Sequence, residues 1–216
     1  AVVIDLFCGS GALGIEALSR GANKVYFCDK QGDALKVTKK NLSFVPDSHY
    51  EIVKGDFLDV LARLSNRGIK ADLIICDPPY DANYVQNILD KINQTAILAS
   101  GGTIIIEQKS RSEEVLHNEF DLVDSRKYGD TKIFFYKKLR KIAVTGTFDP
   151  FTKGHKDLVI KALEDFDRVY VVMLINPDKV PKYSVSERLE MIKLSLREFG
   201  KKVVIKGCTG TSHMQI

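Results

Sequence analysis

A glycine-rich turn near the amino terminus constrains the fold more than any other stretch of the chain. Residues 2–7 form an apolar run typical of a buried strand, and residues 12–20 have the apolar spacing of a helix. Between them lies the motif Gly9-x-Gly11-x-x-Gly14. Glycines suit such a turn because a side chain would block the close approach of a ligand to the backbone. We also expect the helix start to offer free N–H groups and the positive end of the helix dipole.

Carboxylates beside this turn indicate a ligand that carries a nucleoside. Asp5 lies at the end of the first strand, where its side chain can face a ligand rather than the core. Asp29 ends the next apolar run, residues 24–28, at the usual distance for a carboxylate that binds ribose hydroxyls. On these residues NAD and S-adenosylmethionine fit equally well, and a purely structural turn stays open.

The sequence Asp77-Pro78-Pro79-Tyr80 follows another apolar strand, at residues 72–76. Together with the glycine turn, it resembles the site of amine-directed S-adenosylmethionine methyltransferases. An Asp carboxylate and a Pro carbonyl can accept hydrogen bonds from an exocyclic amine, which makes its nitrogen more nucleophilic, while a Tyr ring can stack on the base. We therefore predict catalytic roles for Asp77, Pro78 and Tyr80. An ordinary turn is the plainer interpretation, because Asp and Pro are common turn residues.

Strands and helices alternate along the first hundred residues, which favours a parallel sheet with helices on both faces. The predicted strands are 2–7, 24–28, 50–54 and 72–76, and the predicted helices are 12–20, 31–42, 57–66 and 82–98. The next predicted elements are a strand at 103–107, a short helix near 111–117, and strands at 120–126 and 131–137 joined as a hairpin. A parallel sheet closed by an antiparallel hairpin is similar to the seven-stranded, Rossmann-like methyltransferase fold.

Two stretches resemble one family in particular. Residues 5–22 and the hairpin Gly129-Asp130-Thr131-Lys132 are similar to the 16S ribosomal RNA guanine-N2 methyltransferases, and the resemblance covers residues 1–138. It implies S-adenosylmethionine as cofactor and a guanine of small-subunit ribosomal RNA as target. The family has a segment before the first strand that helps bind cofactor and RNA, so we expect this domain to be truncated at its N-terminus.

The same resemblance implies a set of cofactor-binding residues. Asp56 would contact the adenine amine and Phe57 would pack on the adenine ring. A helix N-cap is an equally good interpretation of Asp56. The full predicted set is Asp5, Gly9, Gly11, Gly14, Asp29, Asp56 and Phe57.

A second strand–turn–helix pattern begins after residues 137–141, a short Lys- and Arg-rich connection between the two predicted domains. Predicted strands at 142–145 and 168–175 flank a predicted helix at 155–165. The turn, Gly146-Thr147-Phe148-Asp149-Pro150 followed by Thr152-x-Gly154-His155, resembles the nucleotidyltransferase signature. When the loop at residues 176–184 is included, residues 141–206 resemble one nucleotidyltransferase family in particular, bacterial phosphopantetheine adenylyltransferase.

This second resemblance implies ATP with Mg²⁺ and phosphopantetheine as ligands. His155 would stabilise charge on the α-phosphate, and Thr147 would orient the attacking phosphate. Lys179 would neutralise phosphate charge, and Phe148 belongs to the same predicted nucleotide-binding site. A surface histidine and a solvated loop lysine are the plainer interpretations of His155 and Lys179. The family's second half has no counterpart in residues 207–216, so we expect this domain to be truncated at its C-terminus.

Composition sets the remaining limits. Residues 1–139 carry 18 Lys and Arg against 19 Asp and Glu, whereas residues 140–216 carry 14 against 9. The first part therefore lacks the bulk positive charge of an autonomous nucleic-acid binder. No apolar stretch approaches the length of a membrane span. The four cysteines lack metal-type spacing, and three of them lie in or directly after predicted buried strands. We therefore expect them to be small core residues of a protein in a reducing cytoplasm.

We expect an α/β protein of two domains, a methyltransferase at residues 1–139 and a partial cytidylyltransferase-like domain at residues 140–216. The leading predicted function is S-adenosylmethionine-dependent methylation of a guanine N2 amine in 16S ribosomal RNA. Pantetheine-phosphate adenylyl transfer in an intact fused protein is one alternative. A fragment that binds cofactor without turnover is the other.

Overall fold

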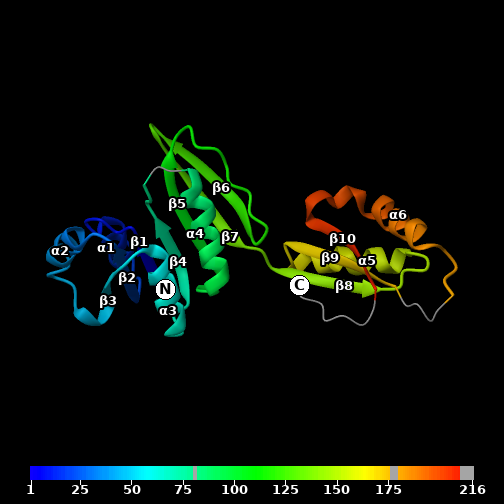
Figure 1. Ribbon diagram of the computed structural model, residues 1–216, viewed down its shortest axis with the longest axis horizontal. Coiled ribbons are helices and arrows are strands. Elements are labelled where there is room, and N and C mark those ends of the chain that lie inside the picture. Colours follow the sequence, from blue (N-terminus) through cyan, green and yellow to red (C-terminus); the bar gives the residue numbers. More distant parts are fainter. Residues whose placement is uncertain (80–81, 176–179, 210–216) are drawn as a thin grey trace. The chain divides into compact units, whose positions relative to one another are not determined.

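The computed structural model describes residues 1–79, 82–175 and 180–209. The chain divides into two compact units, residues 1–138 and 139–216 (Figure 1). Each unit has its own sheet and its own apolar core. Two residues with predicted roles, Tyr80 and Lys179, lie outside the described residues.

A seven-stranded sheet in the order β3-β2-β1-β4-β5-β7-β6 forms the centre of the first unit. Its first five strands run parallel, and β7 runs antiparallel to both β5 and β6. The carboxyl ends of β1 to β5 therefore meet at one edge of the sheet. The strands are β1 (Val2–Leu6), β2 (Lys24–Asp29), β3 (Tyr50–Lys54), β4 (Ala71–Cys76), β5 (Leu98–Lys109), β6 (Phe120–Tyr128) and β7 (Thr131–Lys138).

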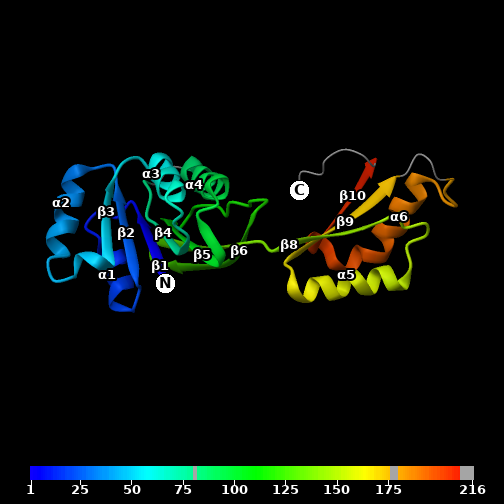
Figure 2. The same ribbon diagram turned by 90° about the horizontal axis from the view of Figure 1, so that it is seen from below.

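Helices cover both faces of this sheet, and side chains alternate between them along each strand. Along β1, Val3 joins the cluster that packs against α1 and α2, whereas Ile4 and Leu6 join the cluster that packs against α3 and α4. Figures 1 and 2 show α3 and α4 side by side on their face. The helical segments are α1 (Ala12–Ser19), α2 (Gly32–Asn41), the 3₁₀ turn η1 (Asp47–His49), α3 (Phe57–Asn66) and α4 (Ala82–Thr95).

The predicted helix near residues 111–117 is wrong, because residues 112–119 have no helix. Contacts with distant residues hold this connection in an irregular path. The Val115 carbonyl accepts a hydrogen bond from the Tyr136 hydroxyl at 3.1 Å, and the His117 Nε2 lies 3.1 Å from an Asp90 carboxylate oxygen. The helix predicted to reach residue 98 ends instead at residue 95.

The second unit is a smaller parallel sheet in the order β10-β9-β8. Both of its α-helices contribute to one core cluster, in which Val159 and Ile192 pack with strand residues such as Met173. Its last strand was not predicted from the sequence. The elements are β8 (Lys141–Gly146), α5 (Lys153–Asp165), β9 (Arg168–Ile175), α6 (Val185–Leu196), the 3₁₀ segment η2 (Arg197–Lys202) and β10 (Val203–Thr209). No helix in the described part of the chain is both long and apolar enough to cross a membrane.

Candidate active sites

The first glycine turn brings helix α1 very close to strand β2. Gly11 has a φ of 81°, in the left-handed region that favours glycine. A Cβ atom on Gly14 would lie only 2.3 Å from the Phe27 ring, and one on Gly11 would lie 2.8 Å from Thr38. Glycine is therefore required at both positions for helix α1 to pack where it does.

The backbone N–H groups of this turn already bind carboxylates. Gly14 N donates to Asp5 Oδ2 at 2.8 Å, and Gly9 N donates to Asp29 Oδ2 at 3.0 Å. The prediction of free N–H groups is therefore wrong at Gly14, because the buried Asp5 carboxylate takes that donor. Because these two N–H donors are occupied by carboxylates, the turn presents negative charge to a ligand instead of free donors for a phosphate.

Three carboxylates gather at this edge because β2, β1 and β4 are adjacent in the sheet. Asp5 is 1% exposed. Its burial raises its pKa to about 6, against the lowering effect of the Gly14 N–H, and the charges of Asp77 and Asp29 add to the rise. Partial burial also raises the pKa of Asp77. Burial and like charges both disfavour the ionised carboxylates here, so a positively charged ligand beside them would be attracted.

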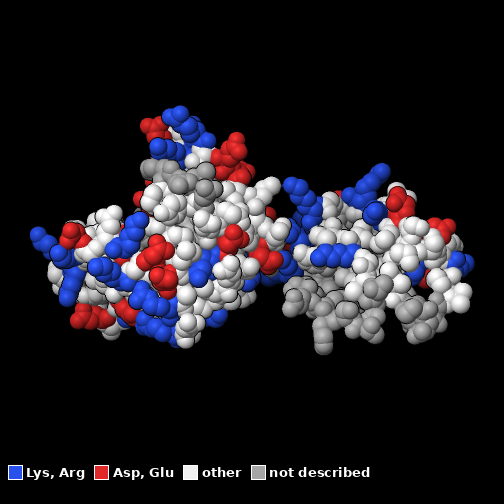
Figure 3. All heavy atoms as spheres, in the orientation of Figure 1, with Lys and Arg blue, Asp and Glu red and all other residues white. Residues whose placement is uncertain are grey.

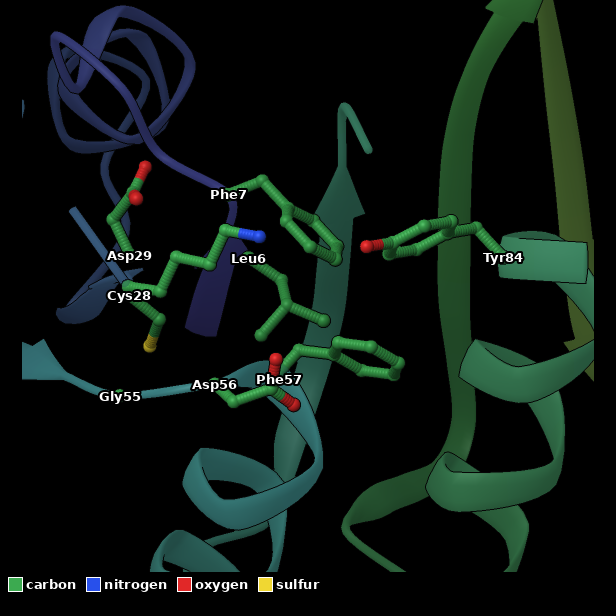
Figure 4. Close-up of a pocket in the computed structure, with 9 residues that line it drawn as sticks. Leu6, Phe7, Cys28, Asp29, Gly55, Asp56, Phe57 and Tyr84 are labelled. Atoms are coloured by element: carbon green, nitrogen blue, oxygen red, sulfur yellow. The ribbon is translucent and has the colours of Figure 1, made fainter. Parts of the chain in front are cut away.

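A pocket opens beside these carboxylates, between the ends of β1, β2 and β3 and the start of α4. Phe7, Phe57 and Tyr84 point toward one another there (Figure 4), with ring centroids 5.5 to 6.0 Å apart. Phe7 has a φ of 73°, which is uncommon for a residue with a side chain. The lining residues are Leu6, Phe7, Cys28, Asp29, Lys30, Gly55, Asp56, Phe57 and Tyr84.

The structure therefore brings Asp29, Asp56 and Phe57 of the predicted set into one pocket. Asp56 is also the N-cap of α3, because its side chain accepts a hydrogen bond from Leu58 N at 3.0 Å. Tyr84, which also lines this pocket, was not predicted from the sequence. An aromatic residue shortly after Asp77–Tyr80 was the available signal, since a helix start at that point faces the same sheet edge.

The Asp-Pro-Pro segment follows β4 at the same edge. Asp77 is partly screened from solvent but more exposed than Pro78, which is buried. A buried proline fixes the backbone at this point and offers no competing N–H donor. The Asp77 carboxylate therefore remains available to a ligand on the solvent side of the pocket.

In the second unit, the turn after β8 is held by contacts on several sides. The Phe148 ring is buried and lies edge-on to the His155 ring, with centroids 5.1 Å apart. His155 Nδ1 accepts a hydrogen bond from Thr152 N at 3.0 Å. In the neutral ring the proton is therefore on Nε2, which can donate to a ligand.

Arg188 supports this turn from α6, and sequence analysis gave it no role. Its Nη1 donates to the Thr147 carbonyl at 2.9 Å, and the residue is 4% exposed. Its Nε is buried and has no hydrogen-bond partner among the residues that the structure describes. The buried Arg188 therefore fixes the position of the Thr147 carbonyl from the side of α6.

No group of three or more His, Cys, Asp or Glu residues within the described ranges is arranged to hold a metal ion.

The seven-stranded unit has the fold of the S-adenosylmethionine-dependent methyltransferases, as predicted, and a cytidylyltransferase-like unit follows it. Residues 1–137 match the family described as Conserved hypothetical protein 95, and residues 143–215 match the family described as Cytidylyltransferase-like. The chain belongs to the Conserved hypothetical protein 95 family.

Individual relatives agree with this assignment. The "Putative rRNA methyltransferase YlbH" of Bacillus subtilis is 36% identical over 138 residues, which cover 62% of this chain and 74% of the relative. Phosphopantetheine adenylyltransferase of Petrotoga mobilis is 41% identical over 66 residues, 31% of this chain. The chain spans about two-fifths of the length of that adenylyltransferase (41%).

Solved structures match the first unit. The "putative methylase HI0767" of Haemophilus influenzae is 26% identical with a TM-score of 0.57, covering 64% of this chain and 86% of that one. SMU.776, determined in complex with SAH, is 18% identical with a TM-score of 0.54, covering 63% and 44%. The second likeness concerns the fold alone.

Proposed function

We propose that residues 1–139 form a methyltransferase domain that uses S-adenosylmethionine to methylate the exocyclic N2 amine of a guanine in 16S ribosomal RNA. The observation that carries the choice of cofactor is the acidic turn. Gly9 and Gly14 direct their N–H groups at the carboxylates of Asp29 and Asp5, so a dinucleotide pyrophosphate would meet negative charge where it needs donors. A sulfonium cofactor is attracted by the same carboxylates.

The pocket residues fit the parts of such a cofactor. Asp29 lies where a ribose would be bound, and Phe57 offers an apolar face to the adenine beside the carboxylate of Asp56. The bound cofactor supplies an electrophilic methyl group. SAH, the demethylated form of this cofactor, is bound in SMU.776, a protein with the same fold.

The chemistry at the target amine falls to the segment after β4. The Asp77 carboxylate accepts a hydrogen bond from the guanine N2 amine, which draws its lone pair out of conjugation with the ring. The Pro78 carbonyl accepts the second N–H, and Tyr80 stacks on the base. Holding the amine in line with the methyl group is then mainly a matter of positioning.

The relative YlbH, with rRNA in its name, supports ribosomal RNA as the substrate class. Incubating the chain with tritiated S-adenosylmethionine and unmodified 16S ribosomal RNA, followed by nucleoside analysis, tests the proposal. We expect label in N2-methylguanosine. Label in another nucleoside would contradict the target, and binding of cofactor without any label would support the alternative of an inactive fragment.

As the alternative function, we propose that residues 140–216 contribute to nucleotidyl transfer from ATP, accompanied by Mg²⁺, to phosphopantetheine in an intact fused protein. The supporting observation is the orientation of His155, whose Nε2–H is left to donate to an α-phosphate at the start of α5. Thr147, on the same turn, would orient the attacking phosphate, and Lys179 would neutralise charge. Pyrophosphate release from ATP and phosphopantetheine is the test, and release that persists unchanged in His155→Ala would contradict this role.

A further inference from the structure

A groove separate from the cofactor pocket lies on the first unit, where α2 meets the edge strand β3. Its helix residues are spaced three and four apart, as one face of α2 requires, and its strand residues alternate, as one face of β3 requires. Leu35, Tyr50 and Ile52 belong to the apolar cluster under α2. The lining residues are Gly32, Leu35, Lys36, Lys39, Asp47, Tyr50, Ile52 and Lys54.

The groove exists because the sheet ends at β3. Helix α2 contacts both β2 and β3, and no further strand of the described sheet lies beyond β3 to complete that face. Tyr50 and Ile52 are therefore only partly buried. The base of the groove is therefore partly apolar, and charged residues line its sides.

The charges along this groove are mostly positive. Lys39 and Lys54 are exposed and have no salt-bridge partner among residues 1–79, 82–175 and 180–209. Lys36 pairs with Asp33 at 2.8 Å, with both side chains more than 80% exposed, so this contact contributes little. The one acidic lining residue, Asp47, accepts a hydrogen bond from the Tyr50 hydroxyl at 2.7 Å.

Lys54 also lies close to the start of α2. A Cβ atom on Gly32, the first residue of that helix, would be 3.3 Å from Lys54 Nζ. A helix start carries partial positive charge, so an ammonium group beside it is unfavourable unless an anion lies near both. Figure 3 shows Lys and Arg side chains over the α2 end of the first unit, with several Asp and Glu side chains among them.

We propose that this groove binds the phosphodiester backbone of the RNA substrate, with Lys39 and Lys54 contacting phosphates. The inference rests on the proposed RNA substrate. It also accounts for how a unit whose net charge is close to zero can hold RNA. Residues 24–54 carry six Lys against four Asp and Glu, so positive charge is concentrated around the groove rather than spread over the surface.

The position of the groove relative to the cofactor pocket fits this role. Lys54 is followed directly by Gly55 and Asp56, which line the cofactor pocket. From β3 to β4, which bears Asp77, the sheet spans three strand spacings, about 14 Å. An RNA whose guanine lies at Asp77 therefore has to extend several nucleotides across the sheet edge to reach the groove.

Filter binding of a 16S ribosomal RNA transcript over a series of salt concentrations tests the inference with the full chain. We expect the double substitution Lys39→Ala/Lys54→Ala to reduce the slope of log affinity against log salt by about 1.4 to 1.8, because each lost phosphate contact accounts for about 0.7 to 0.9. Lys137→Ala is the matched control. Lys137 is exposed on β7 and lies across from Thr103, which is in the middle of β5 and six residues before the carboxyl end of that strand. Its slope should equal that of the parent chain.

The outcomes separate this inference from the proposed function. An unchanged salt slope in the double variant, with transcript methylation also unchanged, overturns the groove assignment alone. Binding to the groove that does not depend on salt also overturns it, since that result would indicate an apolar ligand. A parent chain that neither binds nor methylates the transcript overturns both. A reduced slope with unaltered S-adenosylmethionine affinity supports the groove as an RNA contact separate from the cofactor pocket.

Discussion

Replacing Asp5 with asparagine should stabilise the first unit at neutral pH while weakening cofactor binding. Asn keeps an oxygen that can accept the Gly14 N–H bond but removes the buried charge. Burial raises the pKa of Asp5 from 3.8 to about 6, and a shift of that size corresponds to about 3 kcal/mol of unfolding free energy lost when the group ionises. The folded state of the parent chain binds the proton more tightly than the unfolded state does. Its stability relative to Asp5→Asn is therefore greatest below about pH 4 and falls as pH rises through 6.

Native-state hydrogen exchange of β1 and β4 amides measures this free energy for the first unit alone. The comparison between the two proteins across pH cancels the titration of the other carboxylates. We expect Asp5→Asn to gain about 3 kcal/mol on the parent chain between pH 3.5 and pH 7.5. A difference that does not change with pH would refute the reasoning, because it would mean that Asp5 is ionised at no cost in its buried position.

Substitutions at two further positions and one pH dependence follow from the same geometry. Asp77→Ala should abolish methyl transfer but leave cofactor affinity within about twofold, because Asp77 acts on the amine most strongly in the transition state; retained turnover in the methylation assay would contradict that role. His155→Ala should destabilise α5 by about 1 kcal/mol and His155→Gln should restore most of it, because Gln at this position can still accept the Thr152 N–H. Amide exchange in α5 measures the stability of the helix in both variants. An equal loss of stability in His155→Ala and His155→Gln would argue against a capping role for His155. S-adenosylmethionine affinity should rise between pH 5 and pH 7 in calorimetry as Asp5 ionises, and Asp5→Asn should flatten that rise.

The sequence predicted best those parts of the fold whose conformation is determined by residues adjacent in the sequence. Gly11 and Gly14 could be read as a strand-to-helix turn because the requirement for glycine there arises from local backbone geometry and close packing. The capping role of Asp56 was likewise available from its place before an amphipathic helix. The alternation of strands and helices then indicated the parallel sheet.

What sequence could not supply depends on residues far apart in the chain. The irregular path near Val115 is held by the hydrogen bond from the Tyr136 hydroxyl to the Val115 carbonyl, and no local sequence pattern predicts that contact. The acidic character of the glycine turn depends on Asp5 turning back to Gly14, which spacing alone does not reveal. Arg188 supports the Thr147 carbonyl across 41 residues. Each of these is a tertiary contact rather than a local preference.

The measurement that tests the central claim most directly is calorimetric titration of the full chain with S-adenosylmethionine and, separately, with NAD. The acidic turn made by Asp5 and Asp29 should bind the sulfonium cofactor and reject the pyrophosphate. Asp29→Ala should weaken the first interaction by about 1–3 kcal/mol, because it removes a charged hydrogen-bond partner of the ribose. Binding of NAD with no binding of S-adenosylmethionine would contradict the account.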